Sequence, residues 1–107
     1  MINASGYKVW PAEVESMIFN HPEVREACVI SQPDARRGER VKACVVLADE
    51  ATATPEAIRE WCRSQMAAYK VPSHIEICQS LPRSSTGKIQ WRALQEAEWA
   101  EPARDDA

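Results

Sequence analysis

The stretch LPRSSTGKIQWRAL, residues 81–94, has the composition of a loop that passes into a helix. The hydroxyl groups of residues 84–86 can bond to the nearby backbone, which opposes helix formation. Gly87 lacks a Cβ and therefore permits a sharp turn and the close approach of a ligand. Lys88 follows as a compact, mobile positive charge. The pattern predicts a lysine presented where a loop ends and ordered structure begins.

The same stretch excludes one common phosphate-binding motif. A P-loop needs a glycine five residues before its Gly-Lys pair, and position 82 is proline. Serine, threonine and glycine are also common loop formers, so a Gly-Lys pair alone is a weak signal of function. From the residues alone, a plain surface loop stays the alternative.

Outward from this stretch, the chain alternates between strand-like and helix-like patterns. Pro11 and Pro55 suit the first turn of a helix. Two alternating apolar segments joined by a polar turn should pair antiparallel. The expected elements are a hairpin over residues 2–9, helices over 11–20, 54–66 and 90–99, and strands over 24–32, 41–47 and around 75–77.

This order predicts an α+β fold, with a small, about three-stranded sheet, helices packed on it and an N-terminal hairpin. Residues 1–100 would form the domain, and residues 101–107 a polar, frayed tail. Trp61 and Trp91 fall on apolar stripes and are expected in the core. The polar turn over residues 33–40, with its three arginines, is expected to be solvated.

Composition narrows the class of protein. The chain has 107 residues, enough for one small domain, and its 45% hydrophobic and 27% charged content is typical of a globular protein. A net charge of −3 argues against nucleic acid or an anionic membrane surface as a partner. No apolar run has the length of a membrane span, and no signal-peptide pattern opens the chain, so a cytoplasmic protein is expected.

The cysteines give no sign of a metal site. None of the four, Cys28, Cys44, Cys62 and Cys78, forms a Cys-x-x-Cys pair, and the two histidines are not at ligand spacing. We therefore expect no metal, and we expect the cysteines to be small core residues in a reducing cytosol.

Several blocks of the sequence together resemble a known family. Residues 81–94 resemble the closing signature of the AMP-forming acyl-CoA synthetases, the adenylate-forming ligases: Leu-Pro-Arg/Lys, small polar residues, Gly-Lys-Ile, then a basic residue before a leucine. YKVP at residues 69–72, SGYKV at 5–9 and PAEVE at 11–15 match further blocks in the same order. The resemblance covers nearly the whole chain, is strongest to bacterial fatty acyl-CoA ligases, and implies the C-terminal domain of such an enzyme.

The resemblance implies a reaction in two halves. A carboxylic acid reacts with ATP, supplied with Mg²⁺, to give acyl-AMP and pyrophosphate, and coenzyme A then displaces AMP to give the thioester. Lys88 would be the adenylation lysine, because its ammonium group can reach the charge that builds up between carboxylate and phosphate. Lys8 would lie near the nucleotide.

The resemblance also implies a coenzyme A side. Ser5 could hydrogen-bond the cofactor, and Gly6 would let the pantetheine chain pass close to the backbone, although a plain hairpin glycine is the alternative. Arg63 matches an arginine that contacts coenzyme A phosphates in some members. A solvated helix charge is the alternative for Arg63.

The implied partner is the large N-terminal adenylation domain, with its phosphate loop and acyl pocket. We expect the chain to be an excised or separately expressed mobile domain, with Met1 an introduced start, that is inactive alone and binds no cofactor tightly. The alternatives are the C-terminal part of a peptide-synthetase adenylation domain, whose acceptor is a carrier phosphopantetheine, or a non-catalytic interaction module.

Overall fold

The computed structural model describes residues 1–4, 6–36 and 38–100. Ser5, Arg37 and the predicted tail over 101–107 lie outside the described residues. In chain order the elements are β1 (Ile2–Ala4), β2 (Tyr7–Val9), α1 (Pro11–Phe19), β3 (Val24–Asp34), β4 (Gly38–Leu47), α2 (Pro55–Gln65), the short 3-10 helix η1 (Ala68–Lys70), β5 (His74–Cys78) and α3 (Trp91–Trp99).

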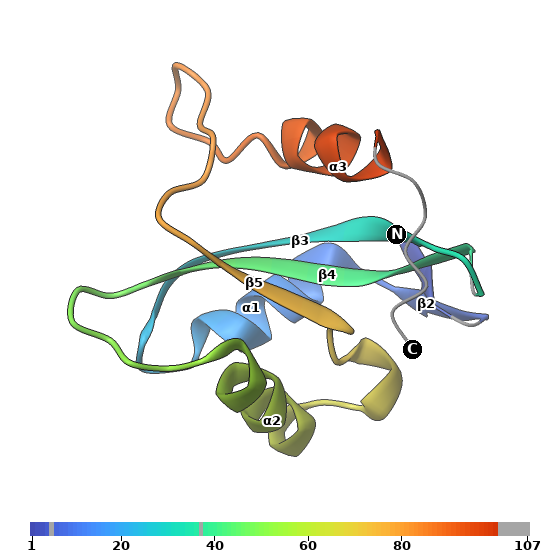
Figure 1. Ribbon diagram of the computed structural model, residues 1–107, viewed down its shortest axis with the longest axis horizontal. Coiled ribbons are helices and arrows are strands. Elements are labelled where there is room, and N and C mark those ends of the chain that lie inside the picture. Colours follow the sequence, from blue (N-terminus) through green and yellow to red (C-terminus); the bar gives the residue numbers. More distant parts are fainter. Residues whose placement is uncertain (5, 37, 101–107) are drawn as a thin grey trace.

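The predicted α+β architecture is confirmed. A three-stranded sheet has the order β3-β4-β5, and β1 and β2 form a separate hairpin. The pair β3–β4 is antiparallel, as expected, whereas β4–β5 is parallel. A parallel pair needs a crossover connection, which α2 supplies. Figure 1 shows α1 and α2 on one face of the sheet and α3 on the other.

The larger core lies between the sheet and the pair α1 and α2. The helix α1 contributes Val14 and Ile18, and α2 contributes Ile58 and Cys62. Pro11 begins α1 as expected, and the side chain of Thr54 caps α2 by accepting a hydrogen bond from the backbone N–H of Ala57 at 3.1 Å. The sheet adds the apolar residues Val29, Val41, Ala43, Val45 and Ile75 to the same cluster.

A smaller core lies on the α3 side of the sheet. It consists of buried residues from β3, β4 and the segment after β5, with partly buried residues packed against them: Cys28, Ile30, Cys44, Val46 and Leu81, then Cys78, Ile89 and Leu94. The expectation of cysteines as core residues is therefore confirmed for Cys28, Cys44 and Cys62, while Cys78 is half-buried.

The expectation of a solvated turn over residues 33–40 holds for Ala35, Arg36 and Gly38, which are exposed, but was wrong for Pro33 and Arg40, which are buried. The pairing of β3 with β4 continues to Asp34 and Gly38, so both strands are longer than predicted. The antiparallel register places Arg40 opposite Gln32, and Arg40 is buried. Its Nε donates to Gln32 Oε1 at 2.7 Å, and its Nη1 lies 3.8 Å from an Asp34 carboxylate oxygen.

Trp91 also departs from the expectation of core packing. It is 45% exposed, and the guanidinium of Arg92 lies over its ring at 5.3 Å. Together with the exposed Trp10 it lines a groove of about 440 Å³ between α1 and α3. The reason is that α3 contains no fully buried residue: Leu94 packs, partly buried, against the smaller core, whereas Trp91 faces the groove. Trp61 packs against the larger core as predicted.

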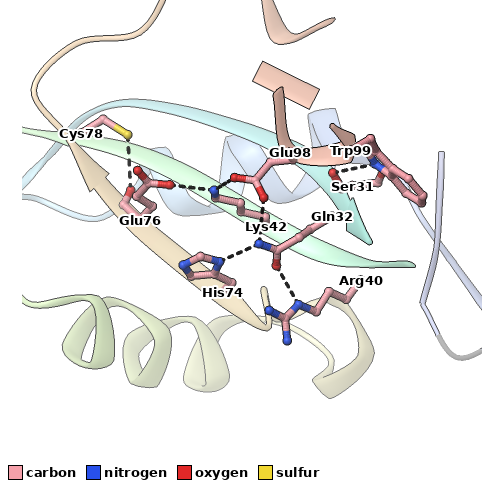
Figure 2. Close-up of polar contacts among 9 residues, drawn as sticks. All are labelled: Ser31, Gln32, Arg40, Lys42, His74, Glu76, Cys78, Glu98 and Trp99. Atoms are coloured by element: carbon pink, nitrogen blue, oxygen red, sulfur yellow. Dashed lines mark hydrogen bonds and ion pairs between the residues drawn. The ribbon is translucent and has the colours of Figure 1, made fainter. Parts of the chain in front are cut away.

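Polar contacts hold α3 on the sheet (Figure 2). Trp99 Nε1 donates to the hydroxyl of Ser31 at 2.8 Å and to its carbonyl at 3.2 Å. Glu98 accepts from the buried Lys42 and, at 3.0 Å, from Gln32 Nε2. These contacts join the end of α3 to both β3 and β4.

The edge strand β3 is closed by side chains. Its backbone N–H groups at Val29 and Ser31 donate to Glu15 Oε2 at 2.7 Å and to Gln95 Oε1 at 3.1 Å. An edge strand with free N–H groups is a site for pairing with other chains, so these two acceptors protect the sheet. Burial raises the pKa of the Glu15 carboxyl group, although the hydrogen bond from Val29 opposes the shift.

Among the described residues, none of the helices has the length and apolar character needed to cross a bilayer.

We expect Ile58→Ala to lower the free energy of unfolding by about 2–5 kcal/mol, because it opens a cavity at a side chain with 0% exposure in the larger core. Phe19→Ala removes a larger side chain that is 58% exposed and should change stability by only about 0.5 kcal/mol. Urea denaturation measures both. Equal losses in the two variants would contradict the position of the core.

Glu15 should make stability depend on pH. Because its pKa is raised on folding, the ionised carboxylate is disfavoured in the folded state, so this contribution to stability is present below the ordinary pKa of 4.5 and is lost as pH rises through the higher folded pKa. Glu15→Gln keeps an oxygen acceptor for Val29 without the charge, so its stability relative to the unsubstituted chain should increase over that window.

The matched variant Glu15→Ala leaves the Val29 N–H without its acceptor and should lose about 1–3 kcal/mol. Urea denaturation at a series of pH values measures all three chains. The same pH profile in the unsubstituted chain and in Glu15→Gln would refute the role of Glu15.

Candidate functional site

The segment that carries Lys88 folds into a small hairpin. Arg83 and Ile89 form an antiparallel bridge, and the N–H of Ser84 donates to the carbonyl of Lys88 at 2.8 Å. The N–H of Gly87 donates to the carbonyl of Ser84 at 2.9 Å, which closes the turn. Gly87 has φ +85°, a left-handed conformation in which residues with a side chain are strained. Glycine is therefore required for this turn.

Further contacts fix the hairpin on the domain. Leu81 is buried in the smaller core at its base. Arg83 forms an ion pair with Glu26 of β3 and donates to the carbonyl of Gly87 at 2.6 Å. The side chain of Lys88 is exposed. In Figure 1 this orange segment extends away from the sheet on the α3 side. The result is a fixed backbone that carries a free amine.

The N-terminal hairpin places Gly6 at its turn. Gly6 has φ +88°, and its N–H donates to Asn3 Oδ1 at 3.1 Å. Among the described residues beyond its two chain neighbours, none places a heavy atom within 4 Å of the position where a Cβ would stand, so one face of the glycine is open. Lys8 follows on β2, exposed and paired with Asn3 across the hairpin.

A cavity lies where this hairpin meets α2. Its volume is about 570 Å³, and Ala4 of the hairpin, Arg59 and Arg63 of α2, and Tyr69 of η1 line it. Arg63 Nη1 donates to the exposed Glu60 Oε2 at 3.0 Å. Both arginines lie beside the cavity, so it could accept an anion.

Sequence reasoning missed Arg59 and Tyr69 as lining residues. Arg59 precedes Arg63 by four positions on a helix, which places both on one face, and this spacing was a usable signal. The ring of Tyr69 stacks on that of Tyr7 with centroids 4.7 Å apart. That contact joins two segments far apart in the chain, so no local pattern predicted it.

The structure separates the predicted residues into two groups. Arg63 lines a cavity that the N-terminal hairpin, which carries Gly6 and Lys8, also borders. Lys88 lies on the hairpin that rises on the α3 side, whereas α2 covers the other face of the sheet (Figure 1). The two groups therefore lie on opposite sides of the sheet.

A further set of side chains has the chemistry of a metal site. The ligand atoms of Cys44, Glu76 and Cys78 all lie within 4.8 Å of one another. Sequence reasoning missed the set because its residues come from two strands whose register is not visible in the sequence.

Comparison with known proteins shows the family. Residues 13–88 match the AMP-binding enzyme C-terminal domain. The chain is 45% identical over 104 residues to the Acyl-coenzyme A synthetase ACSM2A, mitochondrial, of Homo sapiens, covering 92% of this chain and 18% of that protein. It is 43% identical over 98 residues to a Long-chain-fatty-acid–CoA ligase of Bacillus subtilis (strain 168), with the same coverage of 92% and 18%.

Comparison with solved structures gives the same family. A Mycobacterium tuberculosis fatty acyl CoA synthetase superposes with a TM-score of 0.85 at 38% identity, over 94% of this chain and 20% of that one. The anthranilate CoA ligase AuaEII, in complex with anthranoyl-AMP, gives a TM-score of 0.83 at 40% identity, over 92% of this chain and 20% of that one. The chain thus spans 18–20% of the length of these relatives. It belongs to the family of AMP-binding enzyme C-terminal domains.

Proposed function

We propose that this chain is the mobile C-terminal domain of an AMP-forming acyl-CoA synthetase. The whole enzyme would convert a carboxylic acid, ATP and coenzyme A into acyl-CoA, AMP and pyrophosphate. Its large N-terminal adenylation domain is the proposed partner and would bind the acid and ATP with Mg²⁺. The domain by itself is inactive in this proposal, and it supplies one group of residues to each half of the reaction.

The observation that carries the proposal is the Lys88 hairpin. Its backbone is closed by its own hydrogen bonds, and the Lys88 amine extends from it without a fixed partner among the described residues. A lysine held in this way can enter an active site with little loss of backbone entropy. There it would stabilise the negative charge that accumulates as the carboxylate attacks the α-phosphorus.

The cavity beside Arg63 supports the coenzyme A side. Arg59 and Arg63 supply cationic groups for phosphates, and Tyr69 supplies an aromatic surface. The open face of Gly6 would let the pantetheine chain pass along the backbone. Two arginines beside a cavity of about 570 Å³ favour the free cofactor, with its phosphates, over a carrier-bound pantetheine as the acceptor.

The separation of these two groups across the sheet supports a mobile domain. A single active site can meet the Lys88 hairpin in one orientation of the domain and the N-terminal hairpin in another. We infer that the domain reorients between adenylation and thioester formation, with Lys8 near the nucleotide in the second orientation.

Lys88→Ala should abolish the first half of the reaction in the complete two-domain enzyme. Removal of one charge-stabilising donor lowers such a rate about 100-fold or more. Pyrophosphate release from ATP, measured with a panel of fatty acids, should fall accordingly, while thioester formation from preformed acyl-AMP should persist.

The control for the loss of a surface charge is Arg25→Ala, at an exposed position on β3, which should release pyrophosphate at the unsubstituted rate. Unchanged pyrophosphate release in Lys88→Ala would refute the catalytic role of Lys88.

Gly6→Ala should affect the second half selectively. The added Cβ would stand where the pantetheine chain passes, so thioester formation should fall while pyrophosphate release persists. Gly38→Ala is a matched control, because Gly38 has φ +84° against +88° for Gly6. At both positions the described residues beyond the chain neighbours leave the added carbon free of heavy atoms within 4 Å.

Both substitutions therefore introduce similar backbone strain. Separate assays of pyrophosphate and of thioester distinguish the two variants. Equal effects of Gly6→Ala and Gly38→Ala on thioester formation would attribute the loss to strain and reject the coenzyme A contact.

A further inference from the structure

Thiol and carboxylate groups form a row across the α3 face of the sheet. Cys28 of β3 pairs with Cys44 of β4, and Cys44 pairs with Glu76 of β5. Cys78 follows Glu76 by two positions and therefore points to the same face. Cys44 is buried, Cys78 is half-buried and Glu76 is exposed. The row is thus buried at Cys28 and Cys44 and open to solvent at Glu76.

The distances within this row match what a thiophilic cation requires. The ligand atoms of Cys44, Glu76 and Cys78 all lie within 4.8 Å of one another. In a tetrahedral zinc site, sulfurs about 2.3 Å from the metal stand about 3.8 Å apart. Side-chain rotation alone can close the difference, and the exposed Glu76 leaves a path for the ion to enter.

We propose that Cys44, Cys78 and Glu76 form a binding site for Zn²⁺, with a water molecule in the fourth position. The two sulfurs would be thiolates, and the carboxylate would contribute one oxygen. Thiolate ligands select zinc over the harder magnesium and calcium ions. The site is separate from Lys88 and from the cavity beside Arg63.

Lys42 positions the carboxylate of Glu76 and offsets part of the negative charge of the proposed site. Its Nζ lies 2.6 Å from Glu76 Oε1 and also bonds Glu98 (Figure 2). A carboxylate has a second oxygen, so Glu76 can hold Lys42 and a metal together, as ligating carboxylates commonly do. Two thiolates, two carboxylates, Lys42 and Zn²⁺ sum to one negative charge, so the ion does not leave excess positive charge at the sheet.

Binding would release protons. A cysteine thiol has an ordinary pKa of about 8.5, so both groups carry a proton at neutral pH without the ion. Zn²⁺ would displace one proton from each thiol, and both protons would pass to the solvent. No electron is transferred.

The geometry does not suit a disulfide between the same two cysteines. Neighbouring strands lie about 4.8 Å apart, and an offset of two residues adds about 6.6 Å along the strand, so the Cα atoms stand about 8 Å apart. Disulfides need Cα atoms within about 7 Å. A bridging ion spans that separation where a covalent bond does not.

Occupation of the site would affect the segment that leads to Lys88. Cys78 is the last residue of β5, and Leu81, three positions later, anchors the base of the Lys88 hairpin in the smaller core. A metal that joins Cys78 to β4 would hold this end of β5 in place. Amide hydrogen exchange at residues 79–81 should therefore slow when the ion is bound.

Cadmium titration of the reduced chain tests the proposal, because cadmium bound to thiolates gives an ultraviolet charge-transfer absorption. We expect one Cd²⁺ per chain with this absorption, competition by Zn²⁺, and release of two protons. Cys44→Ser and Cys78→Ser should abolish the absorption, and Glu76→Gln should weaken binding roughly 10-fold or more.

Cys62→Ser is the matched control, because Cys62 is a buried thiol in the other core, and its variant should bind as the unsubstituted chain does. Cys28→Ser should also bind normally. Absence of the absorption, or its loss in Cys62→Ser or Cys28→Ser, would overturn the proposed ligand set. Circular dichroism checks the fold of each variant, and the half-buried Cys78→Ser keeps the test decisive if Cys44→Ser does not fold.

Discussion

The ammonium group of Lys42 lies at the middle of the central strand, with 2% of the residue exposed, between carboxylates from two other elements. Burial alone would lower the pKa of Lys42, but hydrogen bonds to Glu76 and Glu98 raise it above its ordinary value. A charge in this position is tolerated only when it is paired. Lys42 therefore requires β5 on one side and α3 on the other, and this requirement specifies how the α3 face of the sheet is covered.

That requirement explains why α3 can be placed without burying any of its residues. A buried ion pair adds little net stability over a well-packed apolar core, but its geometry is demanding. Glu98 must meet Lys42, and Trp99 and Gln95 must meet Ser31, so one position of α3 satisfies all of these contacts. The larger core supplies the apolar burial on the other face. The stability of the domain thus comes mainly from the larger core, whereas the position of α3 comes from the polar contacts on the other face of the sheet.

The sequence predicted what depends on local patterns. Pro11 and Thr54 correctly predicted where two helices begin. The alternation of apolar and polar residues predicted the antiparallel strand pair, and three of the cysteines are core residues as expected. Prediction from the sequence was wrong or silent where burial or proximity depends on the register between two strands. Arg40 was predicted to be solvated, but the β3–β4 register places it opposite Gln32. The proximity of Cys44 to Cys78 likewise depends on the parallel register between β4 and β5. The prediction for Trp91 was wrong because Leu94, and not Trp91, is the residue with which α3 packs against the smaller core.

The Lys88 hairpin is held on the domain in a different way from α3, and this difference bears on function. The helix α3 has no fully buried residue and is held largely by contacts of its side chains, so it is expected to belong to the less stable part of the domain. The hairpin shares the smaller core with Leu94 of α3, but its own backbone bonds close within residues 82–90, and Arg83 ties it directly to Glu26 of β3. Local opening of α3 would therefore leave Lys88 in place. A lysine with the role proposed for Lys88 is best carried by such a self-contained turn, anchored to the sheet by the buried Leu81.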